Sequence, residues 1–290
     1  VCSSDLIIMK FMKKFLAVSM TAAMAVSVSA CGGETGGRDA EALVKTATET
    51  MASVTSMSSE MTMDFTMSLE DETMDMTSKA VMDTIYGENL KIKMDVSAET
   101  AGEPVQAYSM YMEQNGDTID AYMDIGDGTW YQQSLTLEDI SQYDAQANAE
   151  MYLQSMEDLK IDGTEELNGY STSIVSGVFT GESMREAMES SGIESLTESM
   201  GLTEEDMETV LNSISDMPVK MWISEEGYIV KYEIDMTGMM QSLMDNMLAA
   251  AAQTTEEVPL VISKTMVTMT CDNFNAVEDF EIPADAAAAV

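Results

Sequence analysis

Apolar and polar side chains alternate along much of the first half of the chain. In residues 61–69 every odd-numbered side chain is apolar and every even-numbered one is polar, and residues 90–96 alternate just as strictly. A period of two is typical of strands with one buried face. Further alternating runs occupy residues 74–86, 105–114, 118–125 and 129–135, and Asn115-Gly116 and Gly126-Asp127-Gly128 stand where hairpin turns are needed. Residues 61–135 are therefore predicted to form a six-stranded antiparallel meander.

Helical spacing appears on both sides of this meander. Residues 39–57 carry apolar side chains about one helical turn apart, with Asp39 in position to cap a helix, and residues 137–159 are helical in character. Residues 182–215 predict two acidic helices broken near Gly192 and Gly201. Residues 236–248 repeat apolar side chains at i, i+3, i+4, i+7 and i+8, which predicts an amphipathic helix.

Two hairpins and a last strand complete the pattern. Residues 162–179 are predicted to turn at Asn168-Gly169, residues 219–236 form the second hairpin, and residues 260–275 form a long strand. The composition shows no strong break between residues 39 and 283. This order of elements predicts an α+β fold in which residues 39–290 form one domain round a long antiparallel sheet.

The N-terminal segment has the character of a targeting signal. Lys13 and Lys14 precede an apolar run over residues 15–28, and Ser29 and Ala30 lead to Cys31, as in a secretory signal peptide. The sequence VSAC resembles the lipobox of bacterial lipoproteins, which implies that Cys31 is lipidated and begins the mature chain. Two acyl chains would anchor it stably to the membrane. The alternative is a plain cleaved signal peptide with a cysteine at the junction.

The boundaries follow from this interpretation. Residues 1–8 are expected to be a non-native or untranslated prefix, residues 9–30 the signal peptide, and residues 31–38 a flexible Gly-rich tether. The expected location is the extracytoplasmic face of the cell membrane, with the lipid anchor as the attachment.

The composition of the chain argues against several classes of function. The 290 residues include 52 Asp and Glu against 13 Lys and Arg, a net charge of −39, which argues against nucleic acid as a partner. The chain has no His, so Ser-His-Asp and Cys-His nucleophile systems and the commonest general base are excluded. Adjacent acids such as Glu225-Glu226 are interpreted as solvated surface. No catalytic residue, metal site or cofactor is predicted, and an enzyme is the least expected function.

A family resemblance joins these observations. The lipobox, the first helix, the meander, the hairpin KMWISEEGYIVKYEIDM and the ending FNAVEDFEIPADA resemble a group of uncharacterised Gram-positive lipoproteins that is similar to the LolA and LppX superfamily. The resemblance implies a curved antiparallel sheet that forms an unclosed half-barrel, with helices covering its concave face. It also implies a lipid or lipoprotein acyl chain as the ligand in that concavity.

Methionine is the strongest compositional signal, with 31 residues. It fills cores in place of Leu, but its flexible thioether also suits sites that accept varied apolar ligands. A ligand cavity is predicted between the concave face and the helix over residues 236–248 as a lid. Its expected lining is Met61, Met63, Phe65 and Met67 from the first strand, Leu90, Ile92, Met94 and Val96 from the third, and Met240, Leu243, Met244 and Met247 from the helix.

Two other functions are left open by the sequence. A structural or interaction lipoprotein of the cell envelope would have the same Met residues in a filled, ligand-free core. Thioether pairs such as Met61/Met63 and Met239/Met240 could instead bind Cu(I), a soft cation. No His accompanies them, so copper is the weaker alternative. The expected function is a non-enzymatic, membrane-anchored lipoprotein that binds a lipid or acyl chain.

Overall fold

A computed structural model describes residues 40–69, 72–87, 89–101, 103–136, 156–190, 211, 214–251 and 260–288. Its strands form one 11-stranded sheet in the order β6-β5-β4-β3-β2-β1-β11-β10-β9-β8-β7. The strands are β1 (Ser56–Leu69), β2 (Glu72–Tyr86), β3 (Leu90–Thr100), β4 (Glu103–Asn115), β5 (Thr118–Asp124), β6 (Trp130–Thr136), β7 (Met156–Leu167), β8 (Tyr170–Phe179), β9 (Met217–Ser224), β10 (Ile229–Asp235) and β11 (Leu260–Asp272).

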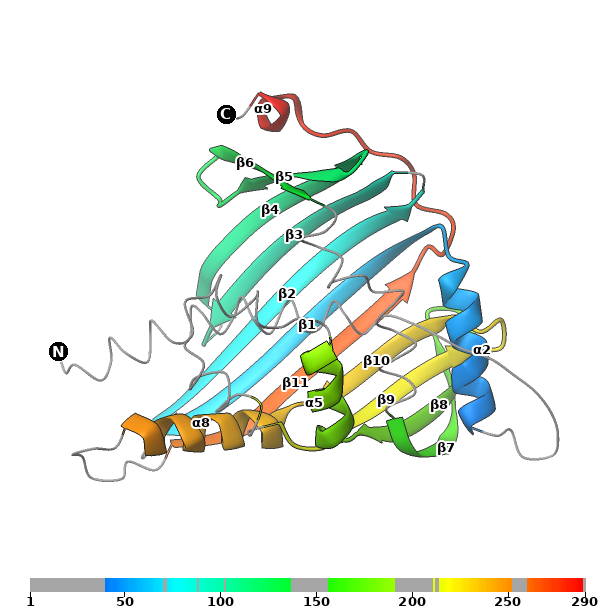
Figure 1. Ribbon diagram of the computed structural model, residues 1–290, viewed down its shortest axis with the longest axis vertical. Coiled ribbons are helices and arrows are strands. Elements are labelled where there is room, and N and C mark those ends of the chain that lie inside the picture. Colours follow the sequence, from blue (N-terminus) through cyan, green and yellow to red (C-terminus); the bar gives the residue numbers. More distant parts are fainter. Residues whose placement is uncertain are drawn as a thin grey trace.

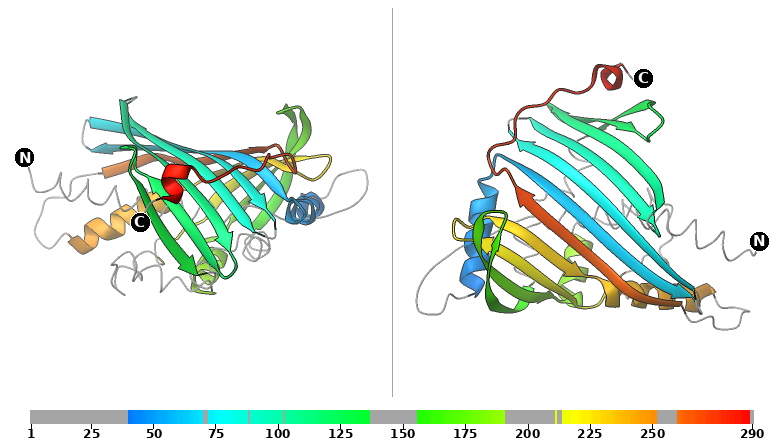
Figure 2. Two further views of the ribbon diagram at one scale, coloured as in Figure 1. Left: turned by 90° about the horizontal axis from the view of Figure 1, so that it is seen from above. Right: turned by 180° about the vertical axis from the view of Figure 1, so that it is seen from behind.

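The sheet is an open half-barrel with helices on one side. Strands β6 and β7 stand at the two ends of the strand order, so the sheet is unclosed. Three helices, α2 (Ala40–Ala52), α5 (Gly181–Ser190) and α8 (Thr237–Ala251), lie on one face of it, as Figures 1 and 2 show from three directions. A short helix, α9 (Ala284–Ala287), follows near the C-terminus. The α+β half-barrel that the sequence predicts is confirmed.

The meander from β1 to β6 is also confirmed, because each strand pairs antiparallel with the next in the chain. Strand β1 lies at the centre of the sheet, since five strands stand on either side of it. The hairpin between β7 and β8 turns at Asn168 and Gly169, whose φ angles are 52° and 84°. Positive φ at both central residues is the requirement of a type I′ hairpin turn, which explains why Asn-Gly occupies it.

The described residues form two apolar core clusters. The larger one joins α2 to the middle of the sheet, and its buried helix residues are Ala40, Val44, Ala47 and Met51. The smaller one joins α8 to one end of β1, β2 and β11, with Met240 and Leu243 from the helix. Helix α2 contacts β7 and β9, on one side of the central strand, whereas α8 contacts β11.

Two predicted boundaries are wrong. The helix predicted over residues 39–57 ends at Ala52, and Met57 is a buried residue of β1. The Ser53 backbone N–H and hydroxyl both donate to the Thr50 carbonyl oxygen, at 3.0 and 2.6 Å, which closes the last turn. β-Branched Val54 and Thr55 then favour extended backbone.

The second wrong boundary lies in β7. Residues 156–159, predicted as the end of a helix, are its first residues. A bulge near Asp158, whose φ is 54°, inserts one extra residue between Met156 and Leu159 and so imitates helical spacing.

The bounds of two other strands are close to those predicted. Strand β9 begins at Met217 and β11 ends at Asp272, within three residues of the predicted bounds. Residues 1–39, 137–155 and 191–210, including the predicted signal peptide, Cys31 and the predicted tether, lie outside the described residues.

Candidate ligand-binding face

The candidate site is the face of the sheet on which the helices lie, here called the covered face. On β1 it carries the odd-numbered residues, which are buried from Met57 to Met67. Cross-strand pairing continues these positions in rows onto both neighbouring strands, so that Met61 lies between Met269 and Ala80, and Met63 between Val267 and Ser78. Among the described residues, the rows through Met57, Ser59, Met61 and Met63 present no charged side chain. The sheet therefore offers an uncharged surface to the interior of the half-barrel.

The structure divides the twelve predicted lining residues between the two core clusters. Met61, Met63, Met94 and Val96 belong to the larger cluster, whereas Phe65, Met67, Met240 and Leu243 belong to the smaller one, with Met244 packed against it. Leu90 and Ile92 share the covered face but are only half-buried. Met247 lies in α8, outside the part of the helix whose side chains are described. Helix α8 thus meets the first strand at Phe65 and Met67 and does not bring all twelve residues together.

A row of methionines crosses the covered face and was not singled out as a set by sequence reasoning. Met82, Met94, Met110 and Met123 are register partners on four consecutive strands, and the row continues to Tyr131. Exposure increases along it, from 3% at Met94 to 38% at Met123 and 50% at Tyr131. The alternation of β3, β4 and β5 was visible in the sequence, but the register that aligns the four thioethers was not. Along this row the covered face is therefore buried at the centre of the sheet and accessible to solvent at β5 and β6.

The tyrosine and cysteine side chains buried on this face are neutral. Burial raises the pKa of Tyr86 and of the Cys271 thiol to about 12 each, and it also raises the pKa of Tyr232. The Tyr232 hydroxyl donates to the Met269 sulfur at 3.0 Å. A thiol with so high a pKa is a poor nucleophile, so the chemistry of this face is that of contact and hydrogen bonding.

The opposite face carries the charges. Lys264 pairs with Asp64, Lys79 with Glu60 and Lys231 with Glu233, each with an N–O distance of 2.7 Å. Charge is therefore separated from the covered face by the pleat of the sheet, since successive residues point to opposite sides.

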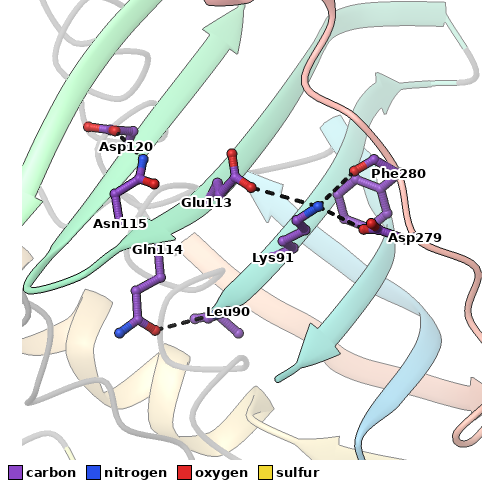
Figure 3. A network of polar contacts seen from close by, with 8 residues as sticks. All are labelled: Leu90, Lys91, Glu113, Gln114, Asn115, Asp120, Asp279 and Phe280. Atoms are coloured by element: carbon purple, nitrogen blue, oxygen red, sulfur yellow. Dashed lines mark hydrogen bonds and ion pairs between the residues drawn. The ribbon is translucent and has the colours of Figure 1, made fainter. Parts of the chain in front are cut away.

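Lys91 is the centre of a further network on the face opposite the covered face, here called the charged face. Its Nζ donates to Asp279 at 2.7 Å and to the Phe280 carbonyl oxygen at 3.2 Å, and lies 3.7 Å from Glu113, as Figure 3 shows. The hydrogen bond between Lys91 and Asp279 raises the pKa of the lysine and lowers that of the carboxyl group. This network fastens the segment after β11 to β3.

Neither a metal cluster nor a spanning helix is found in the described ranges. No group of three or more His, Cys, Asp or Glu residues there could hold a metal ion. No helix within the same ranges is long and apolar enough to cross a bilayer.

Comparison with solved structures gives distant similarities. Lipoprotein LppX of Mycobacterium tuberculosis is 14% identical, and the match covers 83% of this chain and 98% of that one with a TM-score of 0.44. LprF from Mycobacterium bovis is 13% identical, with coverages of 86% and 100% and a TM-score of 0.45. A domain named for outer membrane lipoprotein sorting, from Vibrio parahaemolyticus, is 8% identical, with coverages of 74% and 83% and a TM-score of 0.20.

LppX is a protein after which the superfamily resembled by the sequence is named. All three TM-scores lie below 0.5, so these similarities do not indicate a function. No curated protein matches it. A family model matches residues 39–290, most of the chain, and the protein therefore belongs to the family described as Family of unknown function (DUF6612).

Proposed function

We propose that this protein is a membrane-anchored, extracytoplasmic lipoprotein that binds a lipid or acyl chain on its covered face. The observation that carries the proposal is the row from Met94 to Tyr131, which leads from the buried core to exposed apolar side chains without a charged residue. Burying such surface under a hydrocarbon chain contributes roughly 25 cal/mol per Å². Methionine suits this role because its unbranched side chain adapts to irregular apolar partners.

The proposed role is non-catalytic. The chain contains no His, and the described cysteine, Cys271, is buried with a raised pKa. The carboxylates that form ion pairs in the described residues lie on the face opposite the proposed site. An apolar surface with few polar groups is typical of a ligand-binding site.

The anchor is supported by the sequence that ends in Cys31. We predict that Cys31→Ala releases the protein into the medium or stalls its processing, because no acyl chain would then hold it at the membrane. Fractionation followed by mass spectrometry of the N-terminus measures this. Normal processing together with retention in the membrane fraction would contradict the proposed anchor.

The ligand proposal is tested with a matched pair of substitutions. Met123→Lys places a charge on the exposed part of the methionine row, whereas Val81→Lys places the same charge on the opposite face at a similar exposure, 43% against 38%. We expect Met123→Lys to weaken binding of a fluorescent acyl probe at least tenfold and Val81→Lys to leave it unchanged.

Native mass spectrometry after mild extraction complements this pair, because it shows any lipid that purifies with the protein. If the folded wild type neither carries a lipid nor binds the probe, the structural lipoprotein becomes the better account of the Met-rich core.

A further inference from the structure

We infer that the covered face selects an uncharged acyl ester, with the Ser78 hydroxyl as the donor to its carbonyl oxygen. This inference rests on the proposed function and assigns it a ligand class and a polar contact. It depends on three features of the described residues: an unpartnered buried hydroxyl, the small side chains beside it, and the placement of the cations.

The Ser78 side chain is the first feature. It lies on the covered face in the middle of β2, opposite Met63 on β1 and Ala98 on β3, and is 1% exposed. Its hydroxyl has no hydrogen-bond partner. An unsatisfied hydroxyl in an apolar environment costs free energy, so a ligand that brought an acceptor to Ser78 would recover that cost on binding.

The neighbours of Ser78 are the second feature. Ala98 is its register partner and Ala80 follows it on the same face of β2, so three small side chains adjoin one another. Met63 and Met76, the larger neighbours, are unbranched and can change rotamer at low cost. A narrow group such as an ester can therefore approach the sheet more closely here than beside Phe65.

A second unpartnered hydroxyl provides a contrast. Thr265 is 1% exposed on the same face, and its hydroxyl also lacks a partner. It lies opposite Phe65, however, and its backbone N–H and carbonyl are bonded to Thr237 and Met236 at the start of α8. Thr265 is thus held beneath bulky groups and serves as the matched control.

The cations are the third feature. The lysines of the described strands alternate onto the charged face, and those in β2, β3, β10 and β11 form ion pairs there. In the described helices, Lys45 is exposed and Arg185 donates through Nε to the Leu211 carbonyl oxygen at 3.1 Å. A carboxylate or phosphate on the covered face would be buried without an opposite charge, which is costly. A neutral glyceride avoids that cost.

The test uses three fluorescent probes that share the same labelled C16 chain and differ only in its end group. The end group is a glycerol ester, a free carboxylic acid or the methyl group of an alkane. The full chain with Cys31→Ser, which removes the anchor, is titrated at pH 8. We expect the ester to bind most tightly, the alkane about five- to tenfold more weakly, in line with one hydrogen bond, and the acid most weakly. Ser78→Ala should reduce ester affinity to that of the alkane without changing alkane binding. Thr265→Val should change neither.

Stability separates this role from a structural one. Because the Ser78 hydroxyl has no partner, Ser78→Ala should leave the Tm of the ligand-free protein unchanged or raise it. Equal binding of ester and alkane by the wild type, unaffected by Ser78→Ala, would overturn the inference and leave the proposed function standing. Acid binding as tight as ester binding would also overturn it. Failure of the folded wild type to bind any of the three probes would refute both.

Discussion

Methionine occupies positions on the covered face where other proteins use leucine. Met61 illustrates this: it is buried at the centre of the sheet between Met269 and Ala80. This position requires an apolar side chain of similar volume, and Leu would meet both requirements. What Met adds is the freedom of an unbranched side chain, which matters where the surface must adapt to a ligand.

Substitutions at Met61 separate volume from thioether chemistry. We predict that Met61→Leu changes the free energy of unfolding by less than about 1.5 kcal/mol, whereas Met61→Ala lowers it by about 2–5 kcal/mol through loss of buried volume. Urea unfolding followed by circular dichroism measures both. If Met61→Leu were as costly as Met61→Ala, the sulfur itself would have a structural role.

Buried phenols make the fold sensitive to alkali. The folded state holds the pKa of Tyr86 at about 12, above its ordinary value of 10.0, because burial penalises the phenolate. The stability that the neutral phenol contributes is complete below pH 10 and is lost as the pH rises towards 12. We predict unfolding in that interval, with a midpoint that Tyr86→Phe moves upward. An unchanged midpoint, measured by near-UV circular dichroism, would mean that other groups such as Cys271 govern the transition.

At the scale of elements, α8 takes the place of a strand beside β11. Strand β10 ends at Asp235, opposite Met266, so the backbone of residues 260–265 needs other partners on that edge. The helix supplies them. The Ile262 N–H donates to Gln241 Oε1 at 2.6 Å, Gln241 Nε2 donates to the Leu260 carbonyl oxygen at 3.2 Å, and the Thr265 N–H donates to Thr237 Oγ1 at 2.9 Å.

Gln241 is therefore expected to hold the helix against the sheet. We predict that Gln241→Leu lowers the free energy of unfolding by about 1–3 kcal/mol, because it leaves a backbone N–H and a carbonyl oxygen without partners. Hydrogen exchange should accelerate at Ile262 and through α8. Ser242→Leu, at a half-buried position of the same helix, is the control. Unchanged exchange at Ile262 would show that apolar contacts alone fix α8.

The elements that the sequence predicts well are those with strict alternation. Strand β1 was recognisable because every second residue from Thr62 to Ser68 is polar and the residues between them are apolar. The start of β7 was not, because the bulge at Asp158 shifts the period. The docking of α8 was only half predictable. Its apolar stripe showed that it needs a partner, but the end of β11 on which it lies is decided by Gln241 and Thr237 through hydrogen bonds to backbone groups. Such bonds leave no periodic signal.

At the scale of the whole molecule, the segment after β11 links the centre of the sheet to one edge. The Asn275 N–H donates to the Ser56 carbonyl oxygen at 2.7 Å, and Lys91 holds Asp279 and Phe280. The Phe280 ring lies 6.3 Å from that of Tyr111 on β4, and α9 reaches β5 and β6. This segment follows one end of the meander strands, as Figure 1 shows.

Removal of residues 276–290 should therefore loosen the edge and spare the centre. We predict faster hydrogen exchange in β5 and β6, with little change in β1 and β11, because the ladder between the central strands is intact without this segment. Lys91→Met should give part of the same effect by removing the contact to Asp279. A uniform acceleration across all strands would indicate that the segment stabilises the fold as a whole.

The open ends of the sheet have a further consequence. In a closed barrel the number of strands and their stagger fix the radius, so the interior cannot widen unless a ladder breaks. In this protein the strand order ends at β6 on one side and β7 on the other. A small change in twist at each of the ladders between them would alter the width of the half-barrel while every backbone hydrogen bond was retained. The volume enclosed by the covered face is thus set by side chains and by sheet curvature. The same hydrogen-bonded sheet could therefore enclose ligands of different width.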